Sequence, residues 1–311
     1  MERSHVFAGP YLDRNTHLRD DPAGLLAALA DARSRVIPVW NSRNLVVEGD
    51  PPRAALLELG RLPQELHDAD QLILLGQAGN ALYFACALNG TDAPQLMEGA
   101  IFEDLRAAAP ALPANDAGLL GYARAMVTWR QRHRYCGNCG APTQALRGGH
   151  VVLCTNSACA LEQFPRIDPA IIVLISDGDR ALLGRQASWP AGRYSTIAGF
   201  VEIGESLEDA VVREVLEETG VLVDEIRYHS SQPWPFPASL MLGFTAHALS
   251  ADVHRKDKEL EDVRWFSRQD IVARNFLLPT GLSISYRLIE HWFDAGAAVP
   301  LREVTKAWKK P

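Results

Sequence analysis

Apolar residues follow two periods along this chain, and the periods separate expected strands from expected helices. Short apolar runs bounded by turn-forming residues predict strands at residues 36–40, 45–47, 72–76, 81–88, 170–177 and 240–249. Apolar residues at three- and four-residue steps predict helices within 111–134, within 206–220 and at 283–293. An apolar, alanine-rich run that Asp21-Pro22 precedes predicts a further helix through Arg33. Because helices and strands are interleaved, the chain is expected to adopt an α/β (α+β) fold.

The segment from Gly199 to Val221 carries a clear helical pattern with recognisable ends. Ser206 and Asp209 have the spacing of a capping box, and Gly220 suits the residue just past a helix end. The helix within 111–134 is expected to begin at a cap on Asn115 or Asp116.

Three glutamates of the 206–220 helix share one face. Glu214, Glu217 and Glu218 are spaced i, i+3 and i+4, and Glu205 and Arg213 lie near the same surface. Clustered carboxylates are ligands for hard divalent cations, Mg²⁺ or Mn²⁺, which keep coordination sites for a phosphate substrate. A solvated acidic face is the alternative that the acids alone leave open.

Four of the five cysteines lie close together in the sequence. Cys136 and Cys139 form C-x2-C, and Cys154 and Cys159 form C-x4-C. Two such pairs predict a structural zinc site with four thiolate ligands, one Zn²⁺ per chain. Disulfides and a redox C-x-x-C are the alternatives; the first does not suit a reducing cytoplasm, and the second leaves one pair unexplained. Cys86 is expected to be a buried small hydrophobic residue.

Basic residues precede and flank this cysteine segment. Arg130, Arg132, His133 and Arg134 either contact phosphates or are solvated, and we favour solvation. His150 lies between the cysteine pairs and is not expected to be a ligand, since four thiolates complete the site.

Length and charge restrict the class of protein. A chain of 311 residues with a net charge of −7 suggests two or three domains and disfavours general nucleic-acid binding. The sequence contains no apolar run of about 18 residues and no signal-peptide pattern, so a cytoplasmic protein without membrane contact is expected. The expected domains are 1–130 (α/β), 131–166 (zinc ribbon), 167–295 (catalytic) and 296–311 (C-terminal tail).

The spacing of the acidic segment resembles the Nudix box, Gly-x5-Glu-x7-Arg-Glu-apolar-x-Glu-Glu-x-Gly-apolar. The matching residues are Gly199, Glu205, Arg213, Glu214, Val215, Glu217, Glu218, Gly220 and Val221. The resemblance implies a hydrolase of nucleoside diphosphates linked to another group. It also implies a Nudix α/β/α sandwich, here preceded by an N-terminal Nudix-like α/β domain with a zinc ribbon between them.

A second segment, SQPWPFPAS, narrows the resemblance. Downstream of a Nudix box and a four-cysteine ribbon, it is similar to the signature of NADH pyrophosphatases, which also remove NAD caps from RNA. The implied substrate-binding residues are Ser231, Gln232, Pro233, Trp234, Pro235, Phe236, Pro237 and Ala238. From composition alone, a proline-braced corner that packs both aromatic rings into the core is equally consistent. Many relatives have a second C-x2-C where this chain has C-x4-C.

The resemblance also implies roles for the acids. Glu214, Glu218 and Glu259 would hold the catalytic cations with the carbonyl of Ala198. Glu217 would be a cation ligand or the general base. The implied catalytic residues are therefore the box glutamates Glu214, Glu217 and Glu218. Glu261 competes with Glu259 for the downstream position, and a solvated loop is the other interpretation.

Four further roles follow from the same resemblance. Phe164 and Phe200 are candidates to stack on the nicotinamide, and Ser285 aligns with a substrate-contacting position. Glu205 is expected to pair with Arg213 and position the loop, with Gly199 and Gly220 as structural support.

The implied activity is metal-dependent hydrolysis of NAD(H) to AMP and nicotinamide mononucleotide, together with removal of NAD caps from RNA, by a homodimer with shared sites. The rival functions are an NAD-sensing zinc-ribbon regulator without hydrolysis, and a Nudix hydrolase of another dinucleotide or an ADP-sugar.

Overall fold

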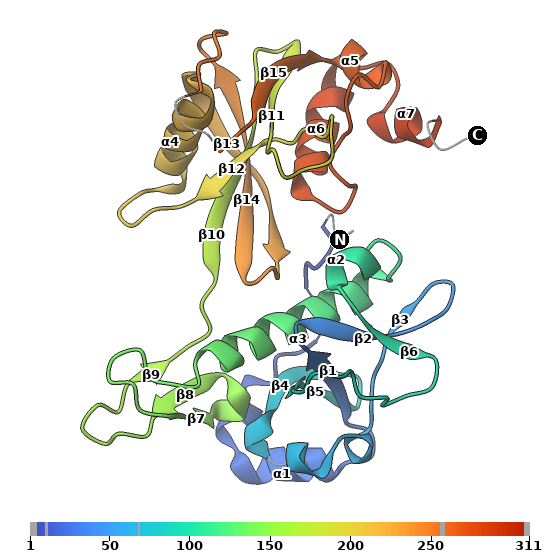
Figure 1. Cartoon of the computed structure of the whole chain (residues 1–311), viewed down its shortest axis with the longest axis vertical. Coiled ribbons are helices and arrows are strands. Elements are labelled where there is room, and N and C mark those ends of the chain that lie inside the picture. Colours follow the sequence, from blue (N-terminus) through green and yellow to red (C-terminus); the bar gives the residue numbers. More distant parts are fainter. Residues whose placement is uncertain (1–4, 10–11, 68, 256–258, 308–311) are drawn as a thin grey trace. The chain divides into compact units, whose positions relative to one another are not determined.

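The computed structural model describes residues 5–9, 12–67, 69–255 and 259–307 (Figure 1). Its contacts divide the chain into two compact units. Unit 1 contains Met1–Ile167 together with Trp234–Ala238, and unit 2 contains Asp168–Pro233 together with Ser239–Pro311. None of the described helices is long and apolar enough to cross a membrane.

Unit 1 contains a six-stranded sheet of order β3-β2-β1-β5-β4, with β6 also paired to β2. Strands β1 and β5 are parallel, whereas β1–β2 and β4–β5 are antiparallel. The strands are β1 (Arg35–Trp40), β2 (Arg43–Val47), β3 (Arg53–Ala54), β4 (Leu72–Ala78), β5 (Ala81–Leu88) and β6 (Ala100–Glu103). The strands predicted at residues 36–40, 45–47, 72–76 and 81–88 are therefore confirmed.

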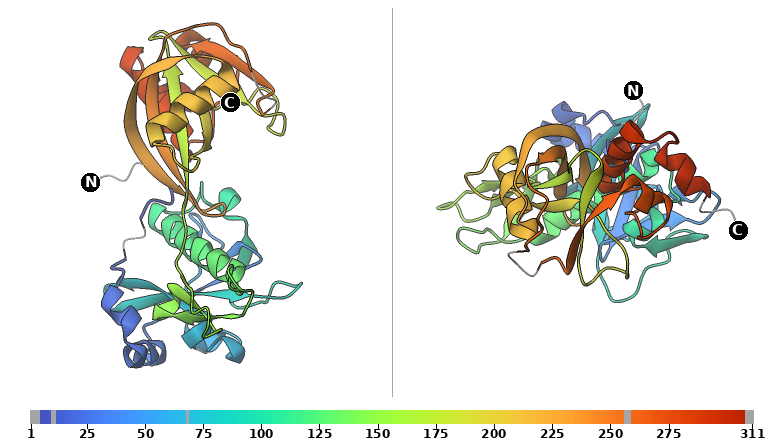
Figure 2. Two further views of the ribbon diagram at one scale, coloured as in Figure 1. Left: turned by 90° about the vertical axis from the view of Figure 1, so that its left-hand side faces the viewer. Right: turned by 90° about the horizontal axis from the view of Figure 1, so that it is seen from above.

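Three helices accompany this sheet: α1 (Pro22–Ala30), α2 (Leu105–Ala108) and α3 (Ala114–Arg132). Figure 2 shows α3, in green, running across the strands of its unit. Its Met126 and Trp129 are buried, as expected of core residues. The predicted cap on Asn115 or Asp116 is wrong, because α3 begins at Ala114 with Pro113 as its N-cap, two residues before Asn115, and without a side-chain cap.

Asp116 has a different role from the predicted one. Its Oδ2 accepts hydrogen bonds from Arg53 Nε at 2.7 Å and from the backbone N–H of Ala54 at 2.9 Å. The carboxylate therefore ties α3 to β3, which sequence spacing cannot indicate because the partners are more than 60 residues away. Helix α1 is also shorter than expected and ends at Ala30; Asp21 does cap it, accepting from Gly24 N.

The cysteine segment of unit 1 forms a separate three-stranded antiparallel sheet. Its strands are β7 (Thr143–Leu146), β8 (Val151–Cys154) and β9 (Glu162–Gln163), with β8 in the middle. So small a sheet buries little apolar surface, and additional crosslinking by a metal is the usual way to stabilise one.

Unit 2 contains a second six-stranded sheet, of order β13-β14-β10-β11-β15, with β12 also paired to β10. Its elements are β10 (Asp168–Ser176), β11 (Arg180–Arg185), β12 (Ile197–Phe200), α4 (Leu207–Thr219), β13 (Val223–Trp234), β14 (Ser239–Ala248), β15 (Asp262–Ser267), α5 (Arg268–Val272), α6 (Ile284–Gly296) and α7 (Leu301–Ala307). The long strand β13 was not predicted, and α7 lies where only a tail was expected.

Both faces of the unit 2 sheet are covered by helices. Alternate residues of β10 point to opposite faces: Ile171 and Val173 pack with α4, while Ile172 and Leu174 pack with α6. Figure 1 shows α4 and α6 on opposite sides of the sheet. The predicted apolar residues of α6 are buried on one face of the helix. They are Ile284, Leu288, Ile289, Trp292 and Phe293. The unit is the expected α/β/α sandwich.

Candidate active site and metal centre

Strand β12 and helix α4 position the acidic residues of unit 2. Antiparallel pairing with β10 sets Ala198 opposite Ile172 and Gly199 opposite Ile171. The loop then enters α4 through the predicted capping box, in which Ser206 accepts from Asp209 N and Asp209 accepts from Ser206 N. The helix ends at Gly220, which adopts the left-handed conformation with φ 74°.

Gly199 lies directly against the carboxylate of Glu214. A Cβ atom added to Gly199 would lie 1.9 Å from Cδ and Oε1 of Glu214, a distance that real atoms do not adopt. The absence of a side chain at residue 199 therefore allows the helix carboxylate to reach the backbone of β12, where the carbonyl of Ala198 also lies.

Arg213 joins the loop to the acidic face of α4. Its guanidinium donates to both carboxylate oxygens of Glu205 at 2.5 and 2.9 Å and to the backbone carbonyl of Phe200 at 2.9 Å. It also contacts Glu214 at 2.9 Å and Glu217 at 3.2 Å. These hydrogen bonds from Arg213 hold the pKa of Glu205 at about 2, so Glu205 is a charged partner of the arginine, as predicted.

The four candidate ligand acids differ in their surroundings. Glu218 is 2% exposed, whereas half of the Glu217 side chain faces solvent. Burial raises the pKa of Glu214, Arg213 opposes this rise, and the charges of Glu217 and Glu259 add to it. Glu259 therefore acts electrostatically on the box. Its competitor Glu261 instead forms an ion pair with Arg185, which favours Glu259 as the residue of this loop that faces the acidic site.

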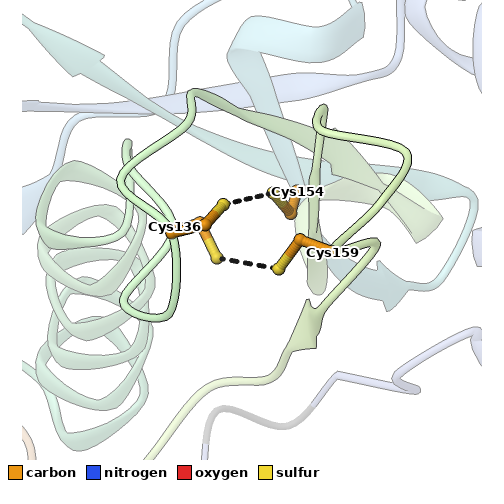
Figure 3. Close-up of side chains that lie close together, drawn as sticks. Cys136, Cys154 and Cys159 are labelled. Carbon is orange, nitrogen blue, oxygen red and sulfur yellow. Dashed lines mark hydrogen bonds between the residues drawn. The ribbon is translucent and has the colours of Figure 1, made fainter.

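The four predicted cysteines converge in unit 1, and Figure 3 shows Cys136, Cys154 and Cys159 directed toward one another. Their sulfur atoms all lie within 4.8 Å of one another, with Cys136–Cys159 at 3.8 Å and Cys139–Cys154 at 3.4 Å. Tetrahedral zinc with Zn–S bonds of about 2.3 Å separates its sulfurs by roughly 3.8 Å. The cluster therefore has the size of a four-thiolate zinc site, and the C-x4-C pair reaches it as well as the C-x2-C pair does.

Two asparagine amides support this cluster and were not predicted. Asn138 Nδ2 donates to the sulfur of Cys159 at 3.3 Å, and Asn156 Nδ2 lies 3.9 Å from that of Cys139. The hydrogen bond from Asn138 lowers the pKa of Cys159 to about 7, which favours its thiolate form. Both asparagines lie inside the cysteine knuckles, so their position in the motif was the available signal.

His150 is not part of the cysteine cluster, as predicted. Its Nε2 forms a hydrogen bond with the carbonyl of Leu74 at 2.7 Å, and burial lowers its pKa to about 4. The neutral ring therefore links the ribbon to β4. Cys86 is fully buried in β5, also as predicted.

The two candidate stacking rings belong to different units. Phe200 ends β12 and is 58% exposed, so one face of its ring is available beside the box. Phe164 is also exposed, and it lines a cavity of about 380 Å³ in unit 1 together with Arg19 and Arg147.

The SQPWPFPAS segment is divided between the units. Gln232 is buried in unit 2, where its amide donates to Leu282 O at 2.7 Å and accepts from Ile284 N at 2.8 Å. Trp234 and Phe236 belong to unit 1 and pack edge-on against Phe7, with ring centroids 6.1 and 5.6 Å away. This is the packing role that composition left open for the two rings, and their contact with substrate stays a prediction.

Two arginines of unit 1 pack against the Phe236 ring. The guanidinium groups of Arg106 and Arg124 lie 4.4 and 4.8 Å from the Phe236 ring centroid. Arg124 also donates to the carbonyl of Pro235. The segment from residue 234 to 238 is thus held by cation–π and hydrogen-bond contacts within unit 1.

Ser285 lies at the start of α6 and is 2% exposed. Its hydroxyl accepts from the backbone N–H of Thr196 at 3.1 Å and bonds the hydroxyls of Ser195 and Thr196, both at 2.8 Å. In the structure Ser285 therefore anchors the segment that leads into β12, and its predicted contact with substrate remains untested.

Comparison with known proteins agrees with this geometry. The model of the NUDIX domain matches residues 166–292. The NAD-capped RNA hydrolase NudC of Stutzerimonas stutzeri is 42% identical over 199 residues, which cover 64% of this chain and 70% of that protein. The chain belongs to the Nudix family. The models of the NADH pyrophosphatase zinc ribbon and of the NADH pyrophosphatase-like rudimentary NUDIX domain match residues 131–164 and 33–129.

The matches to other Nudix relatives cover a smaller share of the relative's own length. NudC of Pseudomonas aeruginosa strain LESB58 is 45% identical over 185 residues, covering 59% of this chain and 64% of that protein. The human NAD-capped RNA hydrolase NUDT12 is 39% identical over 196 residues, covering 58% of this chain, and the match spans only 42% of the human protein's length.

Proposed function

We propose that this Nudix protein hydrolyses the pyrophosphate bond of NAD(H), giving AMP and nicotinamide mononucleotide, and that it removes NAD caps from RNA. The observation that carries the proposal is the acidic face of α4 placed over Gly199, where Glu214 reaches the backbone of β12. The names of the relatives, NAD-capped RNA hydrolases, support NAD as the substrate class.

The acidic residues would hold Mg²⁺ or Mn²⁺ through Glu214, Glu218, Glu259 and the carbonyl of Ala198. Bound divalent cations supply charge neutralisation and a nucleophilic water in reactions of this type. Arg213 holds Glu214 and Glu205 in place from one side. Glu217 is half exposed and contacts Arg213, and it would act as a further ligand or as the base that takes the proton of the attacking water.

Substrate orientation would come from the aromatic rings. Phe200 presents an exposed ring next to the box, and base stacking on such rings is tolerant of the base's identity. Phe164 is the second candidate for stacking on the nicotinamide. We propose a homodimer as the working assembly and the cytoplasm as its compartment, where four ribbon thiolates stay reduced and hold zinc.

AMP release from NADH in Mg²⁺ or Mn²⁺, followed by mass spectrometry, tests the activity. Glu218→Gln removes one buried ligand and is expected to abolish AMP release while the fold is kept. Glu225→Gln is the matched control, because Glu225 is an exposed acid of the same unit that forms a surface ion pair with Arg227. Full turnover by Glu218→Gln at saturating Mg²⁺ would disprove the assignment. Competition between NADH and NAD-capped RNA then establishes which substrate is preferred.

A further inference from the structure

Unit 1 contains a cavity of about 360 Å³ that is separate from the box residues of unit 2. Buried apolar side chains of the two sheets and of α3 line part of it, among them Ile73, Val127 and Val152. A volume of this size lies at the lower end of the range of small-molecule sites, about 300–1,000 Å³. It suits a ligand the size of a mononucleotide.

Arg130 supplies an incompletely satisfied cation to this cavity. Its Nη2 donates to the backbone carbonyl of Asp70 at 2.7 Å, but its buried Nη1 has no hydrogen-bond acceptor among the described residues. Burial lowers the pKa of Arg130, and the nearby charge of Asp70 offsets this only partly. Burying a guanidinium charge is unfavourable, and an anionic ligand in the cavity that Arg130 lines would offset this cost.

The remaining polar lining has the composition of a nucleotide site. Arg134 adds a second, exposed guanidinium, and the amides of Gln71, Asn89 and Gln131 offer both donors and acceptors. Tyr135 is 64% exposed and provides an aromatic face at the cavity. None of the described lining residues is a carboxylate, so the charge of Arg130 and Arg134 favours an anion.

We propose that this cavity binds a nucleotide, with the phosphate on Arg130 and Arg134 and the base against Tyr135. The amide side chains would contact the edge of the base. The arginine cluster before the ribbon therefore contacts a phosphate, in contrast to the solvated role favoured from the sequence. The nucleotide is either a free mononucleotide or one residue of an RNA chain, because the phosphate-plus-base chemistry is the same in both.

Photocrosslinking of the full chain locates the site. The probes are 8-azido-AMP and a 5′-hydroxyl octa-adenylate that carries one 8-azidoadenosine, each applied without NADH so that no unlabelled nucleotide competes with the probe. Mass spectrometry is expected to find the label in peptides that cover residues 127–152. Labelling by AMP identifies a free nucleotide as ligand, and labelling by the oligonucleotide alone identifies an RNA chain.

Two charge reversals make the test specific. Arg134→Glu is expected to weaken nucleotide affinity by about tenfold or more, since it replaces a charge-assisted contact with repulsion. Arg132→Glu changes the net charge equally, but Arg132 does not line the cavity, so it should retain wild-type affinity. Gln131→Glu places a carboxylate on α3, outside the cysteine segment, and should weaken binding even if Arg134→Glu disturbs the ribbon.

Equal affinity in Arg132→Glu and in both cavity variants would overturn the proposal, as would label found only in unit 2. Hydrolysis of NADH is measured in parallel on each variant and should be unchanged. If the wild-type protein does not hydrolyse NADH, that result counts against the proposed function and not against the nucleotide cavity.

Discussion

The two sheets of this protein share one pattern and differ in what connects their strands. The order β6-β2-β1-β5-β4 in unit 1 corresponds to β15-β11-β10-β14-β13 in unit 2, with a central parallel pair in each, β1–β5 and β10–β14. A helix that follows the last strands packs on each sheet, α3 in unit 1 and α6 in unit 2. Unit 1 therefore repeats the sheet framework of unit 2.

The difference lies in one connection. Between β11 and β13, unit 2 has β12, the Gly199 loop and the acidic helix α4. Between β2 and β4, the described part of unit 1 has β3 and short 3-10 turns at Leu59–Arg61, Gln64–Leu66 and Ala69–Gln71. The sheet that the two units share therefore does not supply the acidic residues, because these lie on α4, a helix inserted in unit 2. Four predictions test this comparison.

Glu214→Gln should have the largest effect. Removing one carboxylate charge from the cation site is expected to lower kcat for AMP release by about 10³-fold, since each electrostatic stabiliser of a transition state is worth 10²–10³. Glu65→Gln, an exposed acid in the corresponding connection of unit 1, should leave kcat unchanged. A comparable loss in both variants would mean that the two units share the chemistry.

Gly199→Ala should follow, with about a 100-fold loss of kcat. The added methyl would overlap the Glu214 carboxylate and force it away from β12, and displacements of about 1 Å cost this much in preorganised sites. The control is Gly281→Ala, where an added Cβ has no atom within 4 Å. Circular dichroism should show both variants folded. Wild-type kcat in Gly199→Ala would show that the close approach is unnecessary.

Cys154→Ser tests the zinc site, which is expected in unit 1 and not in unit 2. Replacing one of four thiolates should lower zinc affinity by about tenfold or more, measured as bound zinc per chain against a chelator series. Cys86→Ala changes a buried thiol of the neighbouring sheet and should keep one zinc per chain. Equal zinc content in Cys154→Ser and wild type would exclude the four-cysteine site.

The smallest expected effect is on stability at low pH. The pKa of Glu205 falls from 4.5 to about 2 in the folded state, so the stabilisation from its pair with Arg213 is present above pH 4.5 and is lost as the pH falls to about 2. Glu205→Gln should flatten this part of the curve of unfolding free energy against pH, measured by urea denaturation.

Asp31 of unit 1 is the comparison for this curve, because its pair with Arg33 lowers its pKa from 3.8 to about 2. Asp31→Asn should flatten a narrower window, from pH 3.8 to 2. Unaltered curves for Glu205→Gln would show that Arg213 does not hold this carboxylate in solution.

Local spacing was enough to predict much of the site. The shared face of Glu214, Glu217 and Glu218 follows from helical geometry, and so does the capping box. The cysteine pairs also needed no tertiary information, since short knuckles place both thiolates of a pair together. Elements with strong local periods, such as α4 and α6, were predicted for the same reason.

Contacts between distant residues were decided by the tertiary structure. The sequence determined that Gly199 and Glu214 are both present, but only the packing of α4 against β12 brings the carboxylate onto the glycine. Likewise, only packing places Trp234 and Phe236 against Phe7 and brings the buried Ser285 within hydrogen-bond distance of Thr196. Such contacts depend on how whole elements meet, and residue spacing carries information only about neighbours along one element.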